Sequence, residues 1–161
     1  MATLRAGDVV YVSVADLHRA AATGLCVEHT AVPLDTDSSS TATFGRRRPH
    51  LIVGHDGTSM RLTPLTTRPG ARRILVPQPM RRGGDPMGGW HTLTTLYVND
   101  VTVTYDVPVA SFDRVCGADL YCAPGIPRPS VAPEFLLAVR TCMAKCSNTR
   151  VERKKRQPRA T

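Results

Sequence analysis

The sequence predicts a mainly β protein: a small β-barrel with a C-terminal helix packed on it and a disordered basic tail. Three observations lead to this fold class. Short β-branched runs recur along the first two thirds of the 161-residue chain, turn-forming dipeptides separate them, and one amphipathic helix pattern follows late. A hydrophobic fraction of 42% is ordinary for a folded domain. We therefore expect one domain over residues 1–146 and a tail over residues 147–161.

The strand predictions start at VVYVSV, Val9 to Val14, which follows a Gly-Asp turn signal. Residues 15–45 have no sustained period and are expected to be a long insertion in the domain, with a helical turn or two in DLHRAAATG. HLIVG, His50 to Gly54, is the next predicted strand. The Asp-Gly of HDGT then predicts a hairpin turn, and MRLTPLTT resumes as a strand in which Pro64 indicates an edge or a bulge.

The second half adds ARRILVP as a strand, and TLTTLYVNDVTVTYDVPV is strongly β with a kink or turn at Asn99-Asp100. Between them RRGGDPMGGW is interpreted as a mobile Gly-rich loop, whose Trp90 either stacks on a base or anchors the core. ASFDRVCGADL is expected to hold one helical turn. VAPEFLLAVRTCMAKC predicts the main helix, with Ser130 as its cap and an apolar stripe through Phe135 and Val139.

The formal charge of +8 is concentrated in the tail. Residues 147–161 hold six basic residues and one acid: Arg150, Arg153, Lys154, Lys155, Arg156 and Arg159 against Glu152. We interpret this tail either as a nucleic-acid handle or as a solubilising segment. The first twelve residues have no apolar signal core, and no apolar run approaches the ~20 residues of a membrane helix, so we expect a cytoplasmic protein without a membrane partner.

Five cysteines and five histidines leave other chemistries open. An odd cysteine count argues against a disulfide framework. A zinc site would need four thiolates at poor spacing: Cys116, Cys122, Cys142 and Cys146. Buried thiols are therefore the default, and no metal or other cofactor is expected. A pair of histidines could act as general base and acid, with His55 and His91 the more accessible candidates among His18, His29, His50, His55 and His91.

FGRRRPHLIV places three arginines directly before an apolar strand. Together with RAGDVVYVSV, RLTPLTT, VASFDRV and VAPEFLLAVRTCM, in this order and rough spacing over most of residues 5–143, it resembles the MazF/PemK family of toxin endoribonucleases. The resemblance implies an SH3-like barrel of the CcdB/MazF type and metal-independent cleavage of single-stranded RNA. It also implies a homodimer and a cognate antitoxin. On the matching positions it implies that Arg48 and Thr66 face the scissile phosphate.

Further positive or hydroxyl side chains near these two positions are the expected RNA-binding residues. They comprise Arg46, Arg47, Thr67, Arg68, Arg72 and Arg73, with Lys154, Lys155 and Arg156 of the tail. Two features depart from the family pattern: the long insertion, and Val107-Pro108 where the family has an acid-Gln pair. The alternative is therefore a catalytically inactive SH3-like barrel that binds nucleic acid or serves as a structural or interaction protein in a nucleoprotein or phage assembly.

Overall fold

The computed structural model describes residues 3–30, 47–70, 73–98, 103–116 and 125–156. It is mainly β, as the sequence predicts, and its strands pair antiparallel throughout these ranges. The main sheet has the order β1-β3-β4-β7-β5, and β8 pairs with both β4 and β2. Its strands are β1 Val9–Ser13, β2 Val27–Thr30, β3 Arg47–His55, β4 Ser59–Thr66, β5 Ile74–Leu75, β7 Tyr97–Val98 and β8 Val103–Pro108. No pairing between described residues closes this sheet into a barrel.

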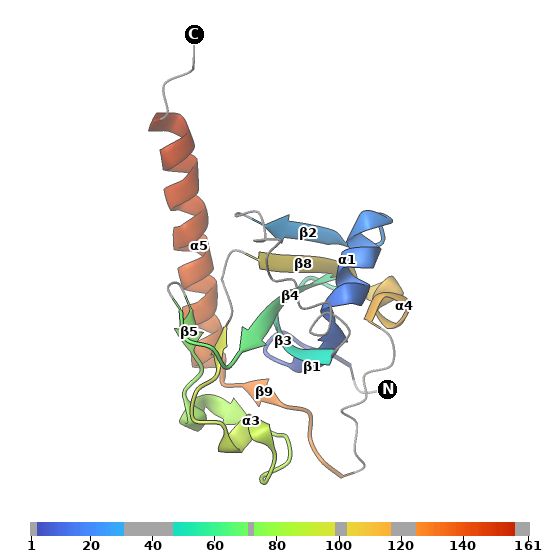
Figure 1. Ribbon diagram of the computed structural model, residues 1–161, viewed down its shortest axis with the longest axis vertical. Helices are drawn as coiled ribbons and strands as arrows, with labels where there is room; N and C mark the ends of the chain where they lie inside the picture. The colour runs from blue at the N-terminus through green and yellow to red at the C-terminus, as the bar shows by residue number, and fades with distance from the viewer. Residues whose placement is uncertain (1–2, 31–46, 71–72, 99–102, 117–124, 157–161) are drawn as a thin grey trace.

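Among the described residues, four α-helices and a second small sheet lie around the main sheet (Figure 1). The helices are α1 Val14–Ala22, α3 Gly89–Thr92, α4 Phe112–Cys116 and α5 Pro133–Arg156, and the 3₁₀ segments are η1 Gln78–Met80 and η2 Val109–Ser111. The two-stranded sheet joins β6 Arg81–Arg82 to β9 Ser130–Val131. In the described part of the chain, no helix has the length and apolar character needed to cross a membrane.

The first strand ends where a capping residue starts a helix. Val9–Ser13 is a strand as predicted, but Val14 already belongs to α1. The Oγ of Ser13 accepts a hydrogen bond from the backbone N–H of Asp16 at 3.3 Å, which satisfies one of the free donors of the first helical turn. The predicted helical turn in the insertion is thus a nine-residue helix. β2, a four-residue strand, was not predicted because its sequence, VEHT, has only one strongly β-favouring apolar residue.

The predicted hairpin between β3 and β4 is confirmed. Asp56 Oδ1 accepts hydrogen bonds from the backbone N–H groups of Thr58 and Ser59, each at 2.8 Å. Gly57 has φ +89°, a left-handed conformation that glycine adopts without strain. β3 begins at Arg47, three residues before the predicted start at His50, so the arginines enter the sheet itself.

Pro64 was predicted to mark an edge or a bulge of its strand, and among the described residues it has a strand partner on one side only. It pairs with His50 of β3 on one side. On the other side of β4, the pairs with β8 end at Leu62 and the pairs with β7 begin at Leu65. The missing N–H of Pro64 therefore falls in the interval between two partner strands, where it interrupts no observed ladder.

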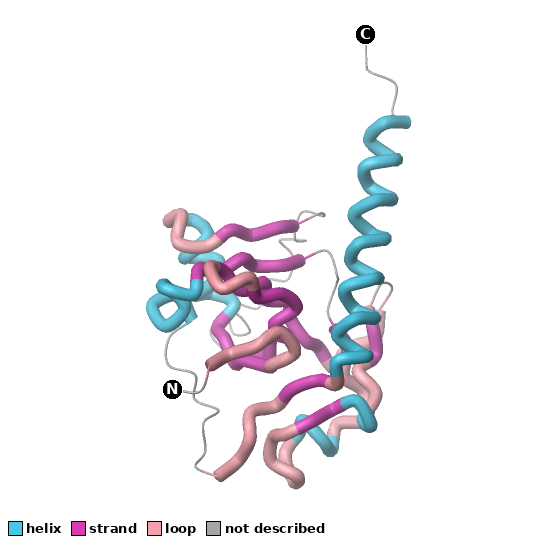
Figure 2. The backbone as a smooth tube through the Cα atoms, turned by 180° about the vertical axis from the view of Figure 1, so that it is seen from behind, coloured by secondary structure: helices cyan, strands magenta, loops and turns pink. Residues whose placement is uncertain are grey.

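The two faces of the sheet pack against different helices. Alternating residues of β3 face opposite sides, so that Ile52 joins one apolar cluster and Leu51 and Val53 join the other. The first cluster includes Leu17 and Ala20 of α1 and Phe112 and Val115 of α4. The second cluster includes Phe135, Leu136 and Val139 of α5. Figure 2 shows α1 and α4 at one side of the sheet and α5 at the other.

The long helix differs from its prediction at both ends. Ser130 is not its cap, because this residue pairs with Arg82 in the small sheet. The last helix also continues to Arg156, so residues 147–156 are helical and not the expected disordered arm. Arginine, lysine and glutamate are good helix formers, and extending a helix already nucleated on a core costs little. Residues 157–161 lie outside the described residues.

The Gly-rich segment RRGGDPMGGW is ordered and not the mobile loop that was expected. Arg81 is buried, and its guanidinium donates hydrogen bonds to the carbonyls of Val76, Trp90 and Leu93 at 2.6–3.2 Å. Gly83 has φ +63°, and a Cβ there would collide with the backbone of Arg128. Trp90 is buried and donates to the carbonyl of Arg82 at 2.9 Å, so it anchors the core and is not exposed for base stacking.

Candidate phosphate-binding site

The two predicted catalytic residues occupy neighbouring strand ends. His50 of β3 pairs with Pro64 of β4, and Arg48 and Thr66 lie two residues beyond this pair on their strands. Because side chains alternate along a strand, Arg48 and Thr66 are on the face that carries His50 and Pro64. This is the face that packs against α1, since Val12, the β1 partner of Arg48, belongs to the first cluster. Both residues are partly exposed.

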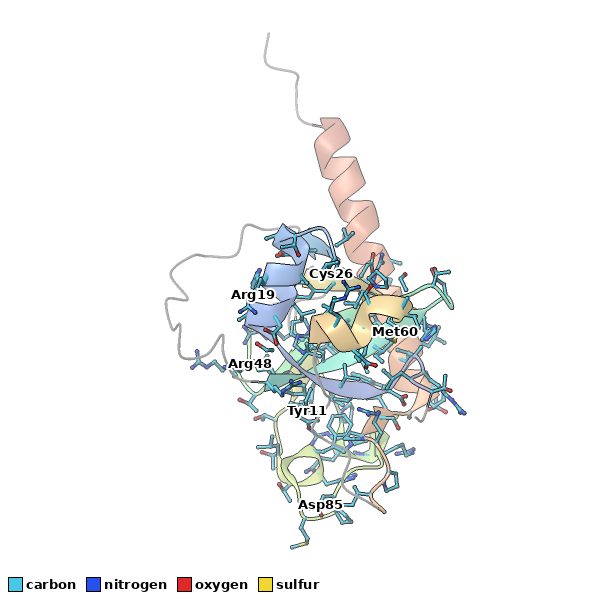
Figure 3. The ribbon with its side chains drawn as sticks, turned by 90° about the vertical axis from the view of Figure 1, so that its right-hand side faces the viewer. Tyr11, Arg19, Cys26, Arg48, Met60 and Asp85 are labelled. Atoms are coloured by element: carbon cyan, nitrogen blue, oxygen red, sulfur yellow. The ribbon has the colours of Figure 1, made fainter. Side chains whose placement is uncertain are left out.

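The polar groups of both side chains are available for a ligand. Within the described ranges, the Arg48 guanidinium has no hydrogen-bond partner, and Figure 3 shows Arg48 on the same side of the molecule as Arg19 of α1. Thr66 Oγ1 accepts a hydrogen bond from the backbone N–H of Arg68 at 3.3 Å. Accepting this bond leaves the hydroxyl proton of Thr66 as a donor. The arrangement offers a planar cation and a hydroxyl to one anionic group.

The structure separates Arg47 from Arg48. As the next residue of the same strand, Arg47 faces the opposite side of the sheet, where its NH1 donates to the carbonyl of Tyr11 at 3.1 Å. Arg47 and Arg48 therefore do not form one cluster. The strand period of two places adjacent residues on opposite faces, but the predicted strand started at His50, so the sequence did not separate the two arginines.

The residues after β4 form a short exposed turn. Thr67 and Arg68 are exposed. Arg73 folds back, and its NH1 donates to the carbonyls of Arg68 and Pro69. Among the other expected RNA-binding residues, Arg46 and Arg72 lie outside the described residues. Lys154, Lys155 and Arg156 lie in α5, and their side chains are outside the described set.

His50 is next to the site on the same strand face but is closed to solvent. It is 0% exposed, and Nδ1 donates to the carbonyl of Arg48 at 2.9 Å. Its Nε2 has no hydrogen-bond partner in the described part of the chain. Burial is the main reason that the pKa of His50 is lowered to about 4. The hydrogen bond to the Arg48 carbonyl opposes this shift, and the nearby Arg48 charge adds to it. His50 is therefore a neutral buried ring and not a proton-transfer group for a bound ligand.

The two histidines expected to be accessible each form a hydrogen bond with a backbone group. His55 Nδ1 accepts from the N–H of Gly57 at 3.0 Å, and His91 Nε2 donates to the carbonyl of Gly83. A contact that was not predicted involves another of the five histidines: Nδ1 of His18 in α1 lies 3.4 Å from the Glu28 carboxylate of β2. No sequence motif predicts this contact, because the chain reverses direction between the two residues and the reversal was not predicted.

The cysteines that the structure describes do not form a metal site. Cys26 is buried and its Sγ donates to the carbonyl of Leu17 at 3.4 Å. Burial, and then the charge of Glu28, raise the pKa of the Cys26 thiol. Cys142 is partly buried, whereas the side chains of Cys116, Cys122 and Cys146 are outside the described set. Among described residues there is no group of three or more histidine, cysteine or acidic side chains arranged to hold a metal ion.

No model of a known protein family matches the sequence, and neither the curated proteins nor the solved structures contain a match to it.

Proposed function

We propose that this protein is a MazF/PemK-like toxin that cleaves single-stranded RNA without a metal ion. The observation that carries the proposal is the placement of Arg48 and Thr66 on one face of adjacent strand ends, two residues beyond the His50–Pro64 pair, with both side chains partly exposed. An antiparallel sheet with a helix-covered core on each face is compatible with an SH3-like barrel, which we include in the proposal.

Cleavage of an RNA phosphodiester bond can use the arginine and threonine side chains of this site as hydrogen-bond donors. The 2′-oxygen of a ribose attacks the adjacent phosphorus and the bond from phosphorus to the 5′-oxygen breaks. The products are a 2′,3′-cyclic phosphate and a 5′-hydroxyl. The 2′-hydroxyl loses its proton to solvent and the leaving 5′-oxygen gains one. Negative charge grows on the non-bridging oxygens during this step, and the Arg48 guanidinium and the Thr66 hydroxyl are donors to those oxygens.

Arginine acts here as a fixed cation and not as a base, because it stays protonated. Its place at the end of a paired strand restricts its backbone: β1 holds β3 at Arg48 through the Val12–Arg48 pair. Donors held in place before the reaction are the main source of transition-state stabilisation in such a site. A homodimer, a cognate antitoxin that covers this face and a cytoplasmic location belong to the same proposal.

The test is incubation of purified protein with single-stranded RNA in the presence of a chelator. Wild type should cleave, Arg48→Ala should lose roughly 10²–10³-fold in rate, and Thr66→Val should lose less. Arg47→Ala is the matched control, since Arg47 is the adjacent arginine on the opposite face and should retain most of the activity. Equal loss in the Arg47 and Arg48 variants would contradict the assignment.

A second candidate is a non-catalytic nucleic-acid-binding module. It is favoured by the burial of His50, because the histidine nearest to Arg48 on its strand face cannot exchange protons with a bound RNA. RNA binding by wild type, weakened in the Arg48→Ala variant and without any cleavage product, would select this candidate over the nuclease.

A further inference from the structure

A second cluster of polar groups lies beside α1, outside the Arg48–Thr66 site. An open groove of about 620 Å³ runs between α1 and β2 and is lined by His18, Ala21, Ala22, Cys26, Val27 and Glu28. The polar groups of this lining come from His18 and Glu28, whose side chains are 31% and 21% exposed. The groove is therefore accessible, with small apolar walls and one carboxylate.

Both polar side chains are held in place by their neighbours. Glu28 pairs with Tyr105 across β2 and β8, so the two side chains share one face. The imidazole of His18 meets the buried Tyr105 ring edge-on, with the centroids 6.0 Å apart and the planes at 90°. Its Nδ1 lies 3.4 Å from Glu28 Oε2. The carboxylate and the imidazole are thus positioned together by α1, β2 and β8.

The groove is close to the candidate phosphate-binding site along α1. Ser13, which caps the helix, pairs with Arg47, and the preceding Val12 pairs with Arg48. His18 follows Ser13 by five residues, which is about 7.5 Å along a helix axis. A nucleic-acid strand with one phosphate at Arg48 can therefore present a neighbouring nucleotide to the groove.

We propose that this groove binds a nucleobase with two adjacent N–H donors, guanine, through the Glu28 carboxylate. This inference rests on the proposed function for the identity of the ligand. An ionised carboxylate only accepts hydrogen bonds, and its two oxygens match the N1–H and N2–H₂ groups of guanine. Adenine has a lone pair at N1 in place of an N–H group, and this lone pair would be repelled by the carboxylate. The methyl groups of Ala21 and Ala22 offer an apolar surface for a flat ring, and His18 is an aromatic contact.

Binding of neutral nucleosides to the full chain, followed by NMR shifts or calorimetry, tests the inference without RNA cleavage. Guanosine should bind at least tenfold more tightly than inosine, which lacks the N2 amino group, and adenosine should bind more weakly still. Glu28→Gln should weaken guanosine binding at least tenfold. Asp16→Asn, which removes a carboxylate that pairs with Arg19 on the same helix, should leave it unchanged.

The outcomes separate this inference from the nuclease proposal. Equal binding of the three nucleosides, no binding of any, or unchanged guanosine binding by a folded Glu28→Gln variant would overturn the guanine site. Arg48→Ala should abolish cleavage and retain guanosine binding. If the wild type cleaves RNA without any preference for guanine, the nuclease proposal is supported and the guanine site is contradicted. If guanosine binds but no RNA is cleaved, the guanine site is supported and the nuclease proposal is contradicted.

Discussion

Two arginines that follow similar sequence patterns have opposite surroundings. Arg81 begins an Arg-Arg pair at β6 and is 3% exposed. Its guanidinium donates to three backbone carbonyls and lies 5.8 Å from the centre of the Trp90 ring. Arg48 ends the Arg-Arg-Arg run at β3, is partly exposed, and has no hydrogen-bond partner for its guanidinium among the described residues. The Arg81 charge stabilises the folded structure, and the Arg48 charge is available for a ligand.

The difference shows what a run of positive charge indicates. A buried guanidinium is tolerated when carbonyl oxygens take up its N–H groups, and burial lowers the pKa of Arg81. An arginine without such partners is held by the strand alone, so its charge can be neutralised by an incoming anion. Partners and burial, and not the density of arginines along the chain, distinguish the two roles.

Removing the buried guanidinium should have the largest effect on stability. Arg81→Met fills much of the same volume but leaves the carbonyls of Val76, Trp90 and Leu93 without donors, so the free energy of unfolding should fall by on the order of 3 kcal/mol. Urea unfolding measures this. Arg82→Met, at the exposed neighbouring position, is the control and should change the same free energy by less than about 1 kcal/mol. A loss of that small size in Arg81→Met would show that the carbonyls find other donors.

The buried histidine should make stability depend on pH. The folded-state pKa of His50 is about 4 and its ordinary value is 6.5, so the unfolded chain binds a proton first as the pH falls. Above pH 6.5 the neutral His50 makes its full contribution to the free energy of unfolding. As the pH falls from 6.5 to 4, this free energy should decrease by on the order of 3 kcal/mol. His50→Leu should flatten this part of the stability profile, whereas His55→Gln, in the exposed turn, should retain it. An unchanged profile in the Leu variant would mean that His50 takes up its proton in the folded state.

A third arginine, which is exposed but paired, should contribute least to stability. Arg61 of β4 forms a two-pronged ion pair with Asp106 of β8, with Nε–Oδ1 and NH2–Oδ2 distances of 2.8 and 3.0 Å, but its side chain is 47% exposed. Arg61→Ala should lower the free energy of unfolding by less than about 1 kcal/mol, because water screens exposed pairs. A loss as large as that of Arg81→Met would contradict the claim that burial separates the two cases.

The sequence predicted the strands that carry a strong local pattern. The β-branched run after Gly7 and the Asp-Gly hairpin are present as expected, because turn chemistry and the apolar alternation of β3 and β4 act over a few residues. β5 lies inside the predicted strand ARRILVP but is only two residues long. β2, β6 and β9 were not predicted, since long-range pairing determines these short strands. The extension of α5 to Arg156 was missed because charge composition was taken as a sign of disorder.

The candidate site was predicted only in part. The common face of Arg48 and Thr66 follows from the hairpin, because two antiparallel strands joined by a defined turn fix which residues lie opposite. The placement of Arg47 on the other face follows from the strand period only once β3 is known to begin at Arg47, which the sequence did not predict. The bonding of Arg73 to its own turn and the approach of His18 to Glu28 depend on how loops and helices pack, and no spacing in the sequence encodes them.

The central claim is that Arg48 and Thr66 bind the same phosphate, and a double-mutant cycle tests it most directly. Rates of RNA cleavage, or RNA affinities if no cleavage occurs, are compared for wild type, Arg48→Ala, Thr66→Val and the double variant. Two donors to one phosphate should be coupled, so the double variant should lose clearly less than the product of the two single losses. Losses that simply multiply would place the two side chains at separate points of contact and contradict the account.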